Sequence, residues 1–338
     1  MILDVSGSMY AALHVDLKAG GGKPQLAYIR HLVLNSILFA NKSFRDEYGE
    51  MIIAFDNSSW RKRFFPLYKW VRYNALTEDD HDWEHIHQCM ETITKEIMEH
   101  LPYPCVRVKY AEGDDVIGVL ADKFTKEGEK VLIISGDKDM VERTKHPLCQ
   151  QYRPVLRSMY DVDDPRRHEF NLFVRGDKDD GVPNILTQDD FYKMQYLVKQ
   201  SGAKTPRASS IASKMVDEFW ETYKTGNEVE IKAYLDNLTK THNEKMLATA
   251  EKKTKKENID LVAPVKIDAY ANFIRNRKLI SLNQIPDLLK DAIITAYDGA
   301  TRNGIMKMLT YMQQNNMVIL AQELKGFEPK RKRPNQIF

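Results

Sequence analysis

Cysteine and long apolar runs are scarce in this chain. Its 338 residues include only Cys89, Cys105 and Cys149, which are scattered and form no CxxC pair. This pattern argues against a disulfide framework and a zinc site, and it is typical of a reducing cytoplasm. No apolar run approaches the ~20 residues that span a bilayer, and the first residues lack the layout of a signal peptide. We therefore expect a cytoplasmic protein without membrane association.

A strong net charge is also absent. The chain has 50 Lys and Arg against 48 Asp and Glu, which gives a formal charge of +2. Any surface that binds nucleic acid must therefore come from local patches. Hydrophobic residues make up 43% and charged residues 29%, which is typical of a soluble protein with a sizeable core. The length suits two domains, or one large domain with an appendage.

Short apolar runs alternate with amphipathic stretches in the first part of the chain. The runs are residues 1–5, 51–55, 106–110 and 131–135, and helical spacing occurs over residues 26–47, 85–100 and 115–127. This alternation predicts an α/β domain over residues 1–170, with a mostly parallel central sheet and helices on both faces. Residues 57–84 interrupt the pattern with an insertion that mixes cations and aromatic residues.

Strand signals fade after residue 170. Helical spacing over residues 191–200, 209–223, 228–238, 286–297 and 304–324 predicts a smaller helical C-terminal domain over residues 171–325. Residues 251–257 (EKKTKKE) indicate a solvated charged stretch, and residues 326–338 indicate a basic tail.

Acidic residues follow the predicted strands. Because the carboxyl ends of parallel strands meet at one edge of a sheet, these side chains should converge. Crowded carboxylates repel one another, and hard cations such as Mg²⁺ prefer oxygen ligands. The pattern therefore predicts a site for two Mg²⁺ ions, with Mn²⁺ as a substitute. The acids are Asp4, Asp56, Glu112, Asp114, Asp137 and Asp139.

Helix capping is the alternative interpretation of these acids. Asp114 and Asp139 stand where helices should begin, and an aspartate at that position commonly caps the helix. Independent capping does not explain the doubled acids, ExD and DxD, at two strand ends. A further acidic cluster, GDKDDGVPNI at residues 176–185, suits either a turn or a loop that starts a helix.

Six short strings occur in a characteristic order along the chain. They are LDVS at 3–6, AFDN at 54–57, YKWVR at 68–72, AEGDDVI at 111–117, SGDKD at 135–139 and GDKDD at 176–180. In this order they resemble the 5′-nuclease (flap endonuclease) family, and within it the ribonucleases H of T-even bacteriophages. The likeness continues at residues 204–206 (KTP) and 284–286 (QIP), so it covers nearly the whole chain.

The resemblance implies a fold, an activity and a place of action. The fold would be the PIN-like 5′-nuclease fold with a helix–three-turn–helix duplex-binding element that starts near residue 176. The activity would be 5′-to-3′ hydrolysis of RNA primers in RNA–DNA hybrids and of 5′ flaps or nicked duplex DNA, by two-metal catalysis. The enzyme would serve phage lagging-strand replication as a monomer in the bacterial host cytoplasm. Implied partners are a single-stranded-DNA-binding protein and a sliding clamp.

The resemblance also assigns site residues. Asp4, Asp56, Glu112 and Asp114 look like ligands of a first metal, and Asp137, Asp139 and Asp177 of a second, with Asp115 and Asp180 as outer members. Lys69 and Arg72 would be catalytic cations of an arch at residues 57–84. Tyr10 matches a position that stacks on a terminal base. Further nucleic-acid contacts would be Arg61, Lys62, Arg63, Tyr68, Gly181, Val182, Lys204 and Arg207.

The chain departs from the family pattern in three places. Gly181 stands where asparagine is usual, Gly113 replaces a usual alanine, and only three residues precede Asp4, where relatives often carry a clamp-binding peptide. Two purely structural interpretations also stay open. The aromatic residues of the arch could fill a core, and the cations of residues 199–214 could form a solvated helix face.

Two other functions compete with a flap nuclease. Asp4, Ser6 and Ser8 match the DxSxS motif of von Willebrand factor A-type domains, which would make the chain a metal-dependent binding module. That module needs one metal and does not account for the remaining acids. The second alternative is a relative with exonuclease activity only, or a catalytically silent homologue, although every acid position is filled.

Overall fold

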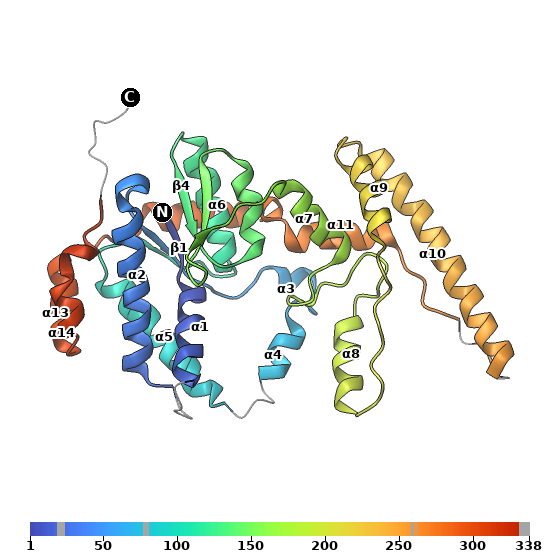
Figure 1. Ribbon diagram of the computed structural model, residues 1–338, viewed down its shortest axis with the longest axis horizontal. Coiled ribbons are helices and arrows are strands. Elements are labelled where there is room, and N and C mark those ends of the chain that lie inside the picture. The colour runs from blue at the N-terminus through green and yellow to red at the C-terminus, as the bar shows by residue number, and fades with distance from the viewer. Residues whose placement is uncertain (19–23, 77–80, 258–259, 262, 331–338) are drawn as a thin grey trace. The chain divides into compact units, whose positions relative to one another are not determined.

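The structure is a computed structural model that describes residues 1–18, 24–76, 81–257, 260–261 and 263–330 (Figure 1). The chain forms two compact units. The first combines residues 1–60, 79–165 and 285–338, and the second combines residues 61–78 and 166–284. Residues 331–338 of the predicted basic tail and the acids at 78–80 lie outside the described residues.

Within the described residues, one sheet of six strands forms the centre of the first unit. The strand order is β3-β2-β1-β4-β5-β6, and only β6 runs antiparallel to its neighbour. The predicted mostly parallel sheet is therefore confirmed. The strands are β1 (Ile2–Asp4), β2 (Ile52–Ala54), β3 (Cys105–Val106), β4 (Val131–Ile134), β5 (Cys149–Arg153) and β6 (Ser158–Met159).

Helices cover both faces of this sheet, as predicted. One face packs against α6 (Gly113–Lys126), with α12 (Asp287–Asp298) beside it. The other face packs against α1 (Val5–Lys18), α2 (Leu26–Tyr48) and α5 (Trp83–His100). Alternation within the strands explains the two layers, because successive side chains point to opposite faces. Leu3 and Ile134 belong to the core under α1 and α2.

The last helices return to the first unit, which corrects the predicted helical domain at residues 171–325. They are α13 (Ile305–Gln314), α14 (Val318–Gln322) and the 3₁₀ turn η3 (Leu324–Phe327). Met308, Met312 and Phe327 are buried in the core of the sheet, and Asn41 donates to the carbonyl of Gly326. The apolar faces of these helices are thus covered by α2 and α5. The predicted tail accordingly cannot begin at residue 326.

The second unit is helical and includes the first part of the predicted arch. Its buried core combines aliphatic side chains with aromatic rings, among them Phe170, Phe173, Phe219 and Phe273. Phe65 and Tyr68 of the arch belong to the same core, which explains why this segment joins the unit. The elements are α3 (Arg61–Phe64), α4 (Trp70–Leu76), α7 (Pro165–Arg175), α8 (Phe191–Gln200), α9 (Ser213–Tyr223), α10 (Glu228–Glu257), α11 (Ala269–Ile280) and η2 (Leu282–Gln284).

Helix α10 is much longer than predicted. It was expected over residues 228–238 but continues to residue 257, so the charged stretch at 251–257 is its last part. Residues 228–257 contain no glycine or proline and many strong helix formers. Conversely, the predicted helix at 304–324 is split, because Asn316 adopts a φ of 56° between α13 and α14. No described helix is long and apolar enough to cross a membrane.

Candidate active site

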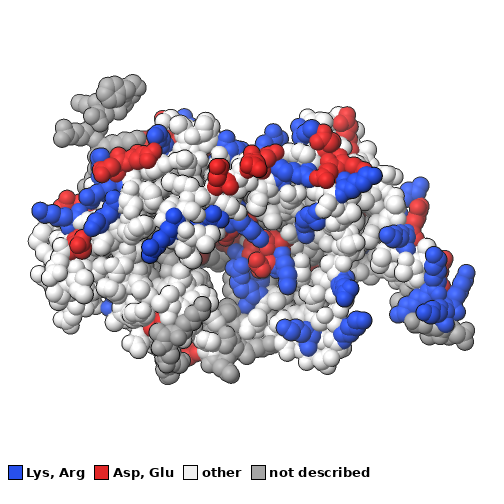
Figure 2. Space-filling view, in the orientation of Figure 1, with Lys and Arg blue, Asp and Glu red and all other residues white. Residues whose placement is uncertain are grey.

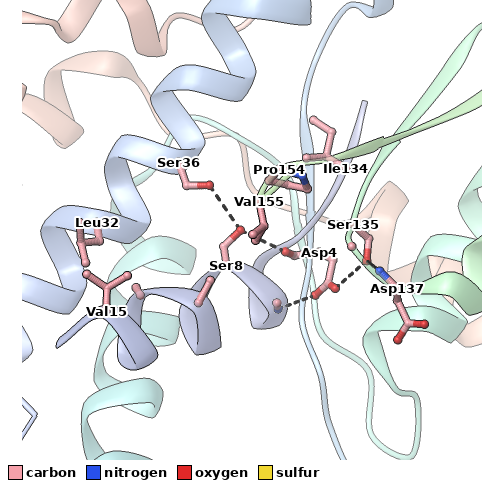
Figure 3. Close-up of a pocket in the computed structure, with 14 residues that line it drawn as sticks. Asp4, Ser8, Val15, Leu32, Ser36, Ile134, Ser135, Asp137, Pro154 and Val155 are labelled. Carbon is pink, nitrogen blue, oxygen red and sulfur yellow. Dashed lines mark hydrogen bonds between the residues drawn. The ribbon is translucent and has the colours of Figure 1, made fainter. Parts of the chain in front are cut away.

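Asp4 stands where β1 ends and α1 begins, at the carboxyl edge of the sheet. Its Oδ1 accepts a hydrogen bond from the Gly7 N–H at 3.0 Å, and its Oδ2 accepts one from the Ser135 hydroxyl at 3.0 Å (Figure 3). Ser135 follows β4, the strand next to β1. The two bonds therefore hold the carboxylate at the point where the neighbouring strands β1 and β4 end.

The environment of Asp4 makes its negative charge costly. Desolvation and the nearby charges of Asp56 and Asp137 raise the pKa of Asp4 from 3.8 to about 6, although the bonds from Gly7 and Ser135 favour the charged form. Side chains that are 52 to 133 residues apart in sequence therefore interact, as the strand-end pattern predicted. At neutral pH this edge holds carboxylates that repel one another.

Asp56 follows β2 and contacts the start of α6. Its Oδ1 accepts a hydrogen bond of 2.6 Å from the Gly113 N–H. A side chain on Gly113 would place its Cβ 3.0 Å from the same oxygen, so the glycine permits this close approach. The carboxylate therefore lies against the first turn of α6, whose macrodipole favours an anion there.

Glu112 and Asp115 form a capping box at the start of α6. The Glu112 N–H donates to Asp115 Oδ2 at 2.9 Å, and the Ser59 hydroxyl donates to Glu112 Oε2 at 2.5 Å. The Trp60 indole N–H is 3.4 Å from Asp115 Oδ1. Asp115 is fully buried and both its oxygens accept hydrogen bonds, so it holds the helix start in place. Capping was predicted for Asp114, but Glu112 and Asp115 form the cap, and Asp114 lies beside them in the same first turn.

Asp137 and Asp139 lie in the loop after β4, where η1 (Lys138–Lys145) begins. Asp137 caps this turn, because its Oδ1 accepts a hydrogen bond from the Asp139 N–H at 2.9 Å. The buried Gln151 on β5 donates to the carbonyls of Ser135 and Asp137, at 2.9 and 2.7 Å. Gln151 thus positions the loop. The sequence analysis missed this role, because a glutamine inside a strand carries no motif.

The strand-end acids of the first unit fit a divalent cation by chemistry. In the described part of the chain, no three Asp, Glu, His or Cys side chains are already arranged as a metal-binding group. The crowding that raises the pKa of Asp4 nevertheless comes from carboxylates at the ends of three neighbouring strands, β2, β1 and β4, and carboxylate oxygens are hard ligands. A divalent cation would relieve this repulsion. The metal ligands therefore stay a prediction that the electrostatics support.

Asp177 lies in a tight loop of the second unit. The main chains of Asp177 and Val182 exchange two hydrogen bonds, of 2.9 and 2.7 Å, and Asp177 Oδ1 accepts from the N–H groups of Asp179 and Asp180. Asp177 is 5% exposed. Gly176 enters the loop with a φ of 73°. The acidic cluster is thus a closed turn whose first aspartate is held by the loop itself.

The two predicted catalytic cations meet at Asp180 in this unit. Arg72 Nη2 is 3.2 Å and Lys69 Nζ 3.7 Å from Asp180 Oδ1, and the Tyr68 hydroxyl donates to Oδ2 at 2.7 Å. The Lys69 N–H also donates to the Asp180 carbonyl, at 2.8 Å. Burial raises the pKa of Asp180, while Lys69 acts in the opposite direction. Asp180 therefore holds the arch cations, a role that its prediction as an outer metal ligand did not include.

Four predicted nucleic-acid contacts are buried. Arg61 is 3% exposed and its Nε donates to the carbonyl of Leu279, so it joins α3 to the end of α11. Tyr68 and Val182 lie in the core of the second unit, at 4% and 0% exposure. The structure corrects these side-chain assignments, because the side chains are buried and already make contacts within the protein. Gly181 is buried as well.

The other predicted contacts are accessible. Tyr10 is 46% exposed on α1, and Arg63, Lys204 and Arg207 are exposed. Lys62 places its ammonium 3.4 Å from the centre of the Tyr73 ring. The core interpretation of the arch aromatics holds for Tyr68, whereas Phe64 is 42% exposed. These accessible side chains stay candidates for contacts with nucleic acid.

The adhesion-type motif does not form a metal site around Ser8. Its hydroxyl is 3.4 Å from the main-chain oxygen of Asp4 and 3.4 Å from the Ser36 hydroxyl on α2 (Figure 3). Ser8 therefore packs α1 against α2 rather than supporting a cation beside the Asp4 carboxylate.

Comparisons with known proteins point to one family. Residues 1–163 match the family model described as "5′-3′ exonuclease, N-terminal resolvase-like domain". Ribonuclease H of Enterobacteria phage T4 is 30% identical over 223 residues, which cover 64% of this chain and 72% of that protein. A 5′-3′ exonuclease of Buchnera aphidicola, from Acyrthosiphon pisum, is 28% identical over 198 residues, which cover 55% of this chain and 65% of the exonuclease.

A solved structure has the same fold. The flap endonuclease of bacteriophage T5, crystallised with DNA and metal ions, covers 88% of this chain and 96% of its own with a TM-score of 0.51 and 16% identity. This likeness shows only that the two proteins share a fold. The evolutionary relationship is shown by the sequence matches. Because the T4 enzyme is matched over 72% of its length and the family model spans the strand-end acids, the chain belongs to the 5′-nuclease family, the nucleases that include 5′–3′ exonucleases and flap endonucleases.

Proposed function

We propose that this nuclease hydrolyses RNA primers in RNA–DNA hybrids and 5′ flaps or nicked duplex DNA from the 5′ side, with two divalent cations, during phage replication. The proposal is supported above all by the position of Asp4 at the carboxyl edge of the sheet, where the charges of Asp56 and Asp137 act on it and raise its pKa. The names of the T4 ribonuclease H and the T5 flap endonuclease support the choice of substrates. Family membership sets the adhesion module aside.

The residues that would hold the cations are the predicted carboxylates. Asp4, Asp56, Glu112 and Asp114 would hold the first, and Asp137, Asp139 and Asp177 the second. Bound Mg²⁺, or Mn²⁺ in its place, would activate water and stabilise charge on the leaving oxygen. Asp115 would act through the capping box, by fixing the start of α6 and hence the positions of Glu112 and Asp114.

Lys69 and Arg72 would supply positive charge to the phosphate. A fixed cation stabilises a transition state more than a mobile one, because no reorganisation is needed at the moment of reaction. Asp180 holds both cations at 3.7 and 3.2 Å. Exposed arch residues such as Phe64 and Arg63 would contact the single strand. A single-stranded-DNA-binding protein, a sliding clamp, a monomeric state and the host cytoplasm are proposed from family likeness.

Cleavage of end-labelled substrates tests this function. RNA–DNA hybrid, 5′-flap and nicked duplex would be incubated with the protein in Mg²⁺, in Mn²⁺ and in chelator. We expect 5′-phosphate-terminated products in either metal and none in chelator. Release of mononucleotides alone would indicate an exonuclease-only enzyme. Absence of cleavage of all three substrates in both metals would refute the proposed function.

Asp180→Asn separates a positioning role from a ligand role. Loss of the charge that holds Lys69 and Arg72 should lower the single-turnover rate about tenfold. This is less than the loss of roughly a hundredfold or more on removing a group that itself contacts the transition state, because Asp180 acts through the two cations. The concentration of Mg²⁺ that gives half the maximal rate should stay unchanged. Asp177→Asn is the comparison, and it should raise that concentration. A higher Mg²⁺ requirement in Asp180→Asn would make Asp180 a ligand after all.

The far half of α10 is a further candidate for duplex contacts. Asn243 ties the helix to the unit through two hydrogen bonds of 2.9 Å with the main chain of Ile267. Beyond it, Lys245, Lys252 and Lys256 are exposed. They continue the helical face on which Ile231 is buried, because spacings of seven and four return to one face. Figure 2 shows cations gathered at this end of α10.

Removing two of these lysines should weaken duplex binding in a salt-dependent way. Each lost phosphate contact reduces the slope of log K against log salt by about 0.9, so Lys252→Ala with Lys256→Ala should reduce it by about 2. Lys240→Ala with Lys255→Ala removes the same charge from other sides of the helix and should change the slope by less than about 1. Equal slopes for the two variants would indicate general electrostatic attraction only.

A further inference from the structure

A group of buried polar side chains on α11 contacts the loop that precedes α8. Asn272, Arg275 and Asn276 lie on one side of α11, because spacings of three and four return to the same side of a helix. They are 9%, 6% and 0% exposed, and we call them the α11 polar face. Buried polar groups are generally hydrogen-bonded, so the partners of this face indicate its role.

Arg275 fixes the direction of both asparagine side chains. It makes five hydrogen bonds, as many as a guanidinium has N–H groups, with the side-chain oxygens of Asn272, Asn276 and Asp189 and the carbonyl of Pro183. A guanidinium only donates, so the amide oxygens of both asparagines must face it. The amide nitrogens therefore face away from Arg275 and are available to the loop.

The two asparagines bind the main chain of the loop at residues 183–187. Asn272 Nδ2 donates to the carbonyls of Ile185 and Thr187, at 3.0 and 3.2 Å. Asn276 Nδ2 donates to the carbonyl of Pro183 at 2.9 Å. These contacts are all with carbonyl oxygens, so they fix the path of the loop. An apolar side chain could fill the same space, but it would leave these carbonyls without their donors.

The loop holds both ends of a basic segment, residues 191–207, which we call the basic arm. The arm starts with α8, directly after the loop, and Asn184 in the loop donates from Nδ2 to the carbonyl of Ser209 at 2.9 Å, just beyond its end. Figure 2 shows cations on the surface over α8. The arm contains no acid, and its cations are Lys193, Lys199, Lys204 and Arg207.

The direction of the basic arm depends on this attachment. All ten residues of α8 are described and none of them is buried, and α8 projects away from α11 in Figure 1. The Tyr196 ring meets the Trp70 ring edge-on at 5.6 Å, which is a contact with another helix that has no buried residue. Gln195 Nε2 donates to the carbonyl of Pro206 at 3.0 Å, which joins two parts of the arm. The core therefore directs the arm through the loop.

We propose that Arg275, with Asn272 and Asn276, is a positioning residue for duplex binding, because it holds the basic arm with its cations toward the phosphates. The proposal rests on the proposed function, since a duplex substrate supplies those phosphates. The three buried side chains would not touch nucleic acid themselves. A binding group that is already held in place loses less conformational freedom on association, so loss of this support should weaken binding.

Asn276→Leu tests the proposal without a change of charge. Leucine has a similar size but provides no donor for the loop, so the arm should lose its direction and part of its phosphate contacts. Each lost contact reduces the slope of log K against log salt by about 0.9, so loss of two of them reduces it by about 2. Fluorescence anisotropy of a labelled nicked duplex in chelator, over a range of salt concentrations, measures the slope. A wild-type slope in this variant would overturn the proposal.

Arg275→Lys and Arg277→Lys form a matched pair on the same helix. Both keep the charge, but lysine lacks the planar fork that orients the two asparagines, so Arg275→Lys should reduce the slope as Asn276→Leu does. Arg277 Nη1 is 2.8 Å from Glu228 Oε1 on α10, an ion pair that lysine can keep, so Arg277→Lys should bind as the wild type. Equal slopes for the two variants would overturn the proposal.

Lys204→Ala with Arg207→Ala shows whether the effect passes through the arm. In the wild-type background the pair should reduce the slope by about 2. In the Asn276→Leu background it should reduce the slope by almost nothing more, because changes that remove the same contacts are not additive. Additive reductions would overturn the proposal.

Two further measurements keep the outcomes separate. Urea unfolding shows whether each variant is folded, and Asn272→Leu takes the place of Asn276→Leu if the latter does not fold. Failure of the wild-type protein to bind the nicked duplex in a salt-dependent way would refute the proposed function. Salt-dependent binding by the wild type with no effect of the α11 changes would refute only the role of Arg275.

Discussion

Asp4→Asn should abolish cleavage and at the same time stabilise the metal-free protein above pH 6. The cleavage rate should fall on the order of a thousandfold, because several kcal/mol of charge stabilisation depend on the bound cations. The stability gain has a separate cause. In the metal-free protein, desolvation and the charges of Asp56 and Asp137 disfavour the Asp4 carboxylate. Asparagine has the same shape and no charge, so it avoids this repulsion.

The pH dependence of the gain follows from the raised pKa. Asp4 binds a proton more tightly in the folded chain, with a pKa of about 6 against an ordinary value of 3.8. The loss of folding stability caused by its negative charge is therefore absent below about pH 4. It grows as the pH rises from about 4 to 6 and is constant above that range. One pKa unit corresponds to about 1.4 kcal/mol, so the penalty is at most about 3 kcal/mol. Partial exposure of Asp4 reduces it further.

Urea unfolding in chelator between pH 4 and pH 8 measures this effect. The free energy of unfolding of Asp4→Asn should exceed that of the wild type by about 2 kcal/mol at pH 8 and by almost nothing at pH 4. Added Mg²⁺ should stabilise the wild type more than the variant, because a ligand stabilises the state that binds it. Asp161→Asn, at an exposed site of the same unit, is the control. A variant less stable than wild type at pH 8 would contradict the crowding of charge at this edge.

Gly176→Ala should open the loop that carries Asp177. A Cβ at this position would lie 2.3 Å from the carbonyl oxygen of Val182, 2.6 Å from the carbonyl carbon of Pro183 and 2.8 Å from the nitrogen of Asn184. All three atoms are main chain, so no side-chain rotation relieves the overlap. The positive φ of 73° adds strain for any residue with a Cβ. We expect a loss of stability of about 3 kcal/mol or more and a fall in cleavage of at least about a hundredfold, if Asp177 holds a cation.

Gly202→Ala isolates the steric part of this effect. Gly202 has a φ of 71°, but nothing lies within 4 Å of an added Cβ. Its alanine variant should lose only about 1 kcal/mol, through the backbone conformation alone. Urea unfolding followed by the tryptophans, together with single-turnover cleavage, compares the two variants. Equal losses of stability would show that the loop after Gly176 shifts easily and that its tight packing does not position Asp177.

Several features of the site could be predicted because they depend on neighbours in sequence or on a general property of sheets. The acids after β1, β2 and β4 were expected to converge, since parallel strands end at one edge. The electrostatic influence of Asp56 and Asp137 on Asp4 agrees with this expectation. The strings around these acids also identified the family, which the T4 relative confirms. The sequence could not predict which of these acids cap a helix and which bind a metal, because both roles favour an aspartate directly after a strand.

Other features depend on packing between distant segments. Arg61 is basic and next to an expected arch, yet it is buried against the end of α11. Asp180 belongs to an acidic loop, yet it meets cations more than 100 residues earlier in the chain. Met308 and Phe327 follow a long helical region but join the core of the sheet. No local sequence pattern predicts these partners. An apolar helix face indicates that another segment covers it, but it does not indicate which segment.

The amino-acid sequence by itself determined the strand–helix alternation, the acids at the strand ends and the family of this nuclease. These follow from residue spacing and from strings of adjacent residues. The tertiary structure alone decided which carboxylates crowd, which cations Asp180 holds and which loop the α11 polar face holds. The reason is physical: desolvation, charge repulsion and hydrogen bonding depend on which atoms surround a group, and the chain brings those atoms from distant positions.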